Sequence, residues 1–205
     1  MLKKNRQMRE YIAKEAARLM IEHGIKSYYQ AKCKAAATLG ITNTHTQLPT
    51  NQEIEQAIIT HLRLFKSESL PTALEKLYQT ALKAMHLFYR FNPYLVGSIL
   101  NGLAFEHSGL NLHLFADTEE EIALFLTEIG IPFQLKSQQL SFSSKKIQTL
   151  PVFCFIAGDT PVELTVFPTA SDRYTPLSPV DGKPMQRAGH KEVQTLLEAV
   201  PSLTS

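Results

Sequence analysis

Seven residues between positions 97 and 163 have the side chains or turn geometry best suited to ligand chemistry. They are turn glycines, polar side chains and one carboxylate: Gly97, Ser98, Asn101, Gly102, Asn111, His113 and Glu163. The first four follow the short apolar stretch 94–96. Asn111 and His113 are two residues apart in the alternating segment 110–115, and this spacing places them on one face of a strand. Glu163 lies in a later strand-like segment, from which it would approach that face.

Two interpretations of this polar face remain open. In the first, Asn111, His113 and Glu163 surround a pocket that binds a nucleotide, or a single metal ion held by His113 and Glu163. In the second, they form the solvent-facing side of an antiparallel sheet. The C-terminal segment after the last strand contains Arg173, Lys183 and Arg187, which are suited to phosphate if that segment folds over the sheet, although it could equally be a surface tail.

The order of these features resembles the core of the DNA polymerase beta-like nucleotidyltransferase superfamily. The resemblance covers roughly residues 72–167 and rests on a strand ending in Gly97-Ser98, a loop, and a strand with alternating polar positions. In that superfamily the Gly-Ser turn holds a nucleoside triphosphate. Two aspartates at i and i+2, together with a third acid on a neighbouring strand, bind two magnesium ions that align the attacking and leaving groups.

The chain departs from this pattern at the metal ligands. Gly109 and Asn111 stand where the superfamily has its two aspartates, and Glu163 aligns with the third acid. Because hard divalent cations prefer anionic oxygen ligands, one carboxylate is a poor site for two of them. The resemblance therefore implies a nucleotidyltransferase-like pseudoenzyme that binds a nucleotide or a macromolecular partner with little or no transfer activity. The alternative is an active magnesium-dependent enzyme that uses Glu163, Asn111 and His113 as altered ligands.

A second resemblance is to a group of short bacterial proteins of unsettled function. It rests on Pro93–Gly97, Asn101-Gly102 and the segment 112–117. Such proteins sometimes receive the name muramate–alanine ligase. An ATP-dependent ligase of that kind would need a phosphate loop such as GKT or GKS in a longer chain, and this sequence has none.

The elements that must position these residues follow from periodicity. The first 90 residues have apolar positions at helical spacing in four segments, and Thr50 with Glu53 forms a capping box. Short strand patterns follow at 94–96, 110–115, 133–136, 140–142, 152–157 and 162–167, with helices after Thr118 and at 191–199. We expect an α+β fold in which a helical N-terminal region (1–70) precedes a small mixed sheet of nucleotidyltransferase type (71–170) and a C-terminal tail with a short helix (171–205).

Charge is distributed unevenly along the 205 residues. The net charge is +2, but residues 1–40 contain nine basic and three acidic residues. A basic helical arm of this kind would suit nucleic acid or an acidic protein surface, so a pure interaction module is a third hypothesis; a solvated helix face is the simpler explanation of the charge. The N-terminus has no apolar core typical of a signal peptide, and no stretch reaches the length of a membrane helix. We expect a cytoplasmic protein without a membrane partner.

Overall fold

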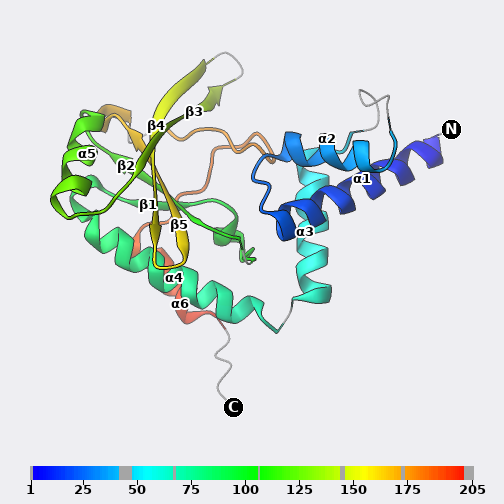
Figure 1. Ribbon diagram of the computed structural model, residues 1–205, viewed down its shortest axis with the longest axis horizontal. Coiled ribbons are helices and arrows are strands. Elements are labelled where there is room, and N and C mark those ends of the chain that lie inside the picture. Colours follow the sequence, from blue (N-terminus) through cyan, green and yellow to red (C-terminus); the bar gives the residue numbers. More distant parts are fainter. Residues whose placement is uncertain are drawn as a thin grey trace. The chain divides into compact units, whose positions relative to one another are not determined.

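The computed structural model describes residues 2–41, 48–66, 68–105, 107–143, 146–171 and 174–200. It divides into two compact units (Figure 1). The first comprises Met1–Leu70, Phe105–His107 and Pro179–Gly182, and the second comprises Pro71–Ala104, Ser108–Ser178 and Lys183–Ser205.

The first unit is helical. Its helices are α1 (Leu2–His23), α2 (Tyr28–Thr38) and α3 (Asn51–Phe65), and α1 packs against the other two. The apolar stripe of α1 is buried, as its periodicity predicts: Ile12 and Ala16 have no exposed surface. The capping box at the start of α3 is confirmed, because the backbone N–H of Glu53 donates to Thr50 Oγ1 at 3.2 Å and that of Thr50 to Glu53 Oε2 at 2.6 Å.

The second unit contains the sheet. Its elements in chain order are α4 (Leu70–Leu87), η1 (Tyr89–Phe91), β1 (Tyr94–Val96), η2 (Ser98–Asn101), β2 (Leu110–Phe115), α5 (Glu119–Glu128), β3 (Gln134–Ser143), β4 (Lys146–Ala157), β5 (Thr160–Phe167), η3 (Thr169–Ser171) and α6 (His190–Glu198). The strand order is β1-β2-β5-β4-β3. Strands β2 and β5 are parallel and the other neighbours antiparallel, so the sheet is mixed. The expected α+β class, with helices first and a mixed sheet after them, is confirmed.

Two details of the sheet differ from the sequence expectation. Segments 133–136 and 140–142 were predicted as separate strands, but β3 is one strand of 10 residues that pairs with β4 in a long hairpin (Figure 1). The polar run Ser137–Gln139 hides this continuity because β3 is an edge strand with exposed side chains. Strand β5 is the last strand in sequence, but it lies at the centre of the sheet between β2 and β4, a position that its sequence pattern does not predict.

Each face of the sheet has its own apolar cluster. On one face Phe155 of β4 contacts Phe88, which follows α4, and Phe88 in turn contacts Phe125 of α5, with ring centroids 6.2 and 5.6 Å apart. On the other face Phe115, Leu150 and Phe167 form a buried cluster. The strand alternation places Asn111, His113 and Glu163 on this second face, which we call the polar face.

Candidate functional site

The pairing of β2 with β5 brings Asn111 and Glu163 together. They are register partners in neighbouring parallel strands, and such strands lie roughly 4.8 Å apart. On the other side of β2, Asn111 pairs with Val96, the residue before Gly97. A Cβ added to Gly97 would lie 3.3 Å from Asn111 Nδ2. Gly97, Asn111 and Glu163, each partly exposed, therefore form one group at this end of the polar face.

The turn after β1 is held by its backbone. Gly97 has φ 98° and ψ −171°, a backbone conformation that residues other than glycine rarely adopt. It directly precedes the short helix η2. The N–H of Leu103 donates to the carbonyl of Ser98 at 3.2 Å. The hydroxyl of the buried Tyr78 donates to the carbonyl of Ile99 at 2.6 Å. Within the turn Asn101 is exposed and Ser98 half-buried, so the predicted turn exists and is anchored from α4.

His113 has a different environment from Asn111. Its side chain is 3% exposed, and its Nδ1 accepts a hydrogen bond of 3.1 Å from Nε of Arg187. The Arg187 guanidinium lies 5.0 Å from the ring centroids of both Phe115 and Phe167. Burial, and secondarily the positive charge of Arg187, lower the pKa of His113 to about 3. His113 is therefore a neutral imidazole whose Nδ1 lone pair is occupied by an arginine.

The position that would hold the first metal-binding aspartate has no space for a side chain. A Cβ added to Gly109 would lie 2.7 Å from the carbonyl oxygen of Pro161, which is backbone that cannot move aside easily. Asn111 and His113 are also two residues apart, so they are a second pair that could be aligned with the two aspartates of the superfamily. Neither this pair nor Gly109 with Asn111 contains an acid, and the carboxylate that β2 and β5 supply to the polar face is that of Glu163. Over the described residues, no group of three or more His, Cys, Asp or Glu side chains is placed to hold a metal ion.

The C-terminal segment reaches both edges of the sheet. The N–H of Leu177 donates to the carbonyl of Ser141 in β3 at 2.6 Å, and Ala188 exchanges two backbone hydrogen bonds of 2.9 Å with Leu95 in β1. Between them Arg187 contacts the aromatic cluster of the polar face, whereas Lys183 is exposed. Arg173 lies outside the described residues. Sequence reasoning singled out Arg187 for phosphate but missed its contact with His113, which depends on a chain reversal that no local pattern encodes.

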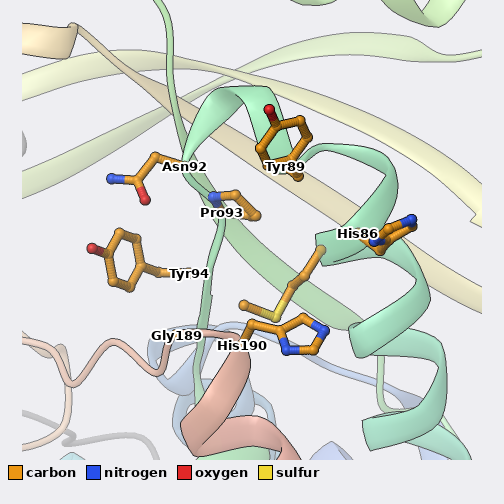
Figure 2. A pocket seen from close by; sticks show the side chains of 8 residues that line it. His86, Tyr89, Asn92, Pro93, Tyr94, Gly189 and His190 are labelled. Carbon is orange, nitrogen blue, oxygen red and sulfur yellow. The ribbon is translucent and has the colours of Figure 1, made fainter.

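Two cavities in the second unit were not predicted. The first, of about 450 Å³, lies where the end of α4, the start of β1 and the start of α6 meet (Figure 2), and its lining comprises Met85, His86, Tyr89, Asn92, Pro93, Tyr94, Gly189 and His190. The second, of about 440 Å³, lies beside the N-terminus of α5 and includes Asp117, Glu121 and Arg90 in its lining. Neither cavity is lined by Gly97, Asn111 or Glu163.

The basic N-terminal helices are partly neutralised within their own unit. Lys14 pairs with Glu10 at 2.8 Å, Arg18 with Glu15 at 2.7 Å, and Arg9 with Glu53 at 2.7 Å. Lys32 donates to the carbonyl of Pro49 and to Asn51 Oδ1, both at 2.7 Å. The excess positive charge of residues 1–40 is thus partly used in intramolecular contacts. Across the described helices, none combines the length and apolar character needed to span a membrane.

Comparison with solved structures gives distant structural matches. No protein-family model and no curated protein matches the chain significantly. A crystal structure of the Cid1 poly(U) polymerase with MgGTP bound, from work on its UTP selectivity, matches with 20% sequence identity and a TM-score of 0.31. The matched region covers 45% of this chain and 32% of the polymerase chain, so the similarity spans about a third of that enzyme. A similarity this low is not evidence of a shared function.

Proposed function

We propose that this protein is a nucleotidyltransferase-like pseudoenzyme that binds a nucleotide at the Gly97-Ser98 turn, Asn111 and Glu163, with little or no transfer activity. The observation that supports the proposal is the register of β1, β2 and β5, which places Asn111 between Val96 and Glu163. These residues are distant in sequence, yet their strand ends meet at the Gly-Ser turn. The arrangement has the order of a nucleotidyltransferase core with one acid retained.

The same geometry argues against efficient catalysis. Two-metal transfer requires several anionic oxygens around two dications, but the carboxylate that β2 and β5 offer on this face is Glu163. An asparagine amide is a neutral and weaker ligand. Altered ligation through His113 is also disfavoured, because this side chain is buried and its Nδ1 accepts from Arg187. The Glu163 carboxylate is therefore better suited to holding a ligand than to supporting nucleotidyl transfer.

A transfer assay tests the catalytic half of the proposal. Purified protein is incubated with labelled ATP, CTP, GTP or UTP, magnesium and RNA or protein acceptors, and Glu163→Ala is the matched variant. We expect no incorporation above the variant's background. Saturable incorporation that Glu163→Ala abolishes would overturn the inactive assignment and establish an enzyme with altered ligands.

A further inference from the structure

The cavity between α4, β1 and α6 has an unusual wall. Figure 2 shows Tyr89, Asn92 and Tyr94 on one side of the opening, with His86 and His190 on the other. Tyr89 is 77% exposed although its neighbours Phe88 and Phe91 are buried. An exposed aromatic ring at the rim of a cavity loses contact with water when a flat ligand stacks on it. This stabilises the bound state.

The lining has neither acidic residues nor lysine or arginine. A phosphate or an ammonium group would therefore find no counter-ion among these residues. The apolar part comes from Met85, Pro93 and the tyrosine rings. The polar groups are the Asn92 amide and the two imidazoles, which together offer both donors and acceptors. A ligand complementary to this wall is flat, uncharged and has hydrogen-bonding groups along its edge.

The backbone at Asn92 shapes the wall of the cavity. Asn92 has φ 45° and ψ 62°, the one left-handed non-glycine residue in the described chain, and it directly precedes Pro93. Asparagine adopts this conformation more readily than other non-glycine residues, and here it ends η1. Asn92 thereby directs the chain from η1 into β1.

We propose that this cavity binds a nucleoside, or the base of a nucleotide, with the ring stacked on Tyr89 and the base edge hydrogen-bonded by polar side chains of the lining, either the Asn92 amide on one side or the imidazoles of His86 and His190 on the other. Its volume of about 450 Å³ is within the range of small-molecule sites, roughly 300–1,000 Å³. The site is distinct from the group at Gly97, Asn111 and Glu163. The proposal therefore goes beyond the proposed function and does not depend on it.

The absence of tryptophan from the chain allows a clean optical test. Tyr89→Trp introduces an indole at the cavity rim, which can be excited at wavelengths where nucleosides do not absorb. The matched control is Tyr29→Trp, because Tyr29 is 71% exposed on α2 and does not line the cavity. Titration with adenosine, guanosine, cytidine and uridine is expected to quench Tyr89→Trp saturably with at least one nucleoside. An equal, linear response of both variants would indicate collisional quenching and overturn the proposal.

Ligand-observed saturation-transfer NMR on the unlabelled wild-type protein removes any effect of the indole. Tyr89→Ala should weaken nucleoside binding roughly tenfold, equivalent to about 1.4 kcal/mol. Asn92→Gly keeps the left-handed backbone while removing the amide, and should reduce the preference among the four bases. Tyr29→Ala, at an exposed position of α2 outside the cavity, should leave nucleoside binding unchanged. No saturable binding by the wild type, or binding that is as tight in Tyr89→Ala as in the wild type, would refute a base site in this cavity.

Discussion

Asn111 and His113 occupy alternate positions of the same strand face, yet their environments are opposite. Asn111 is partly exposed and lies beside Gly97 and Glu163. His113 is 3% exposed and is covered by Arg187 and Phe167. The difference arises from the C-terminal segment, which reaches the second position from more than seventy residues away. Strand alternation thus determines which face a side chain occupies, while tertiary packing determines whether that side chain can meet a ligand.

The two ends of the face also differ in electrostatics. At the Asn111 end, the charged group is the Glu163 carboxylate. At the His113 end a cation lies over aromatic rings, and the low pKa keeps the imidazole neutral. We therefore expect changes at His113 to act mainly on stability, and changes at Asn111 and Glu163 to act on binding. Three substitutions test this contrast, and a fourth, at Gly109, tests the packing beside the Asn111 end.

The largest effect is expected when an aspartate is placed at Gly109. Gly109→Asp places a Cβ 2.7 Å from the carbonyl oxygen of Pro161, and overpacking of this kind costs about 1–3 kcal/mol or more. We expect the free energy of unfolding, measured by urea denaturation, to fall by at least about 2 kcal/mol. Asn101→Asp, the same charge change at an exposed position of the nearby turn, should be within about 0.5 kcal/mol of wild type. An unchanged urea midpoint for Gly109→Asp would contradict this prediction and would show that the backbone at Pro161 can move aside.

Acidification should destabilise the protein through His113. Its folded-state pKa of about 3 is below the unfolded value of 6.5, so the unfolded chain takes up the proton first. The contribution of His113 to the free energy of unfolding is complete above pH 6.5 and is lost as the pH falls towards 3. The loss is about 2 kcal/mol at pH 5. His113→Asn, which retains an acceptor for Arg187, should show a flatter dependence in denaturation series. A wild-type curve parallel to that of His113→Asn would contradict the assignment, as would titration of the His113 ring above pH 5 in NMR spectra.

Converting Asn111 to aspartate should create a cation site at the exposed end. The new carboxylate would be the register partner of Glu163, and affinity for hard cations rises with the number of anionic ligands. We expect Asn111→Asp to bind Mn²⁺ roughly tenfold or more tightly than wild type in calorimetry, with the gain lost in the double variant that also has Glu163→Gln. Equal Mn²⁺ affinity in wild type and Asn111→Asp would mean that the two side chains do not converge.

The smallest effect concerns the charge of Arg187. Arg187→Gln can place an amide N–H where Nε of the arginine donates to His113, while removing the positive charge. Since that charge is the second cause of the lowered pKa after burial, the pKa of His113 should rise, by less than about one unit. NMR titration of the His113 ring measures the shift. A pKa that is unchanged or lower in Arg187→Gln would show that the arginine charge does not act on the imidazole.

Local sequence signals predicted the elements but not their assembly. Thr50 and Glu53 identified the start of α3, and the alternation at 110–115 identified β2, because capping and strand period are encoded within a few residues. The central place of β5 depends on long-range pairing with β2 and β4, so it could not be read from its own sequence. The same is true of the contact between Arg187 and His113.

The candidate site was predictable to a similar degree. The meeting of Asn111 with Glu163 follows from two strands that were both recognised in sequence, although their adjacency and register were not known. The cavity at Tyr89 could not be predicted from the sequence, because its wall combines residues of α4 and β1 with Gly189 and His190, about one hundred positions later. Sites that combine distant segments require the fold.

Calorimetric titration of the wild-type protein with ATP, CTP, GTP and UTP in the presence of magnesium tests the central claim most directly. The account predicts saturable heat with at least one nucleotide, reduced by roughly tenfold in affinity in Gly97→Ala, which alters the turn at φ 98°. Gly130→Ala, the same change at another left-handed glycine of this unit (φ 69°) with open space for the new Cβ, serves as the control and should bind normally. No saturable heat with any of the four nucleotides, or identical binding by wild type and Gly97→Ala, would contradict nucleotide binding at this turn.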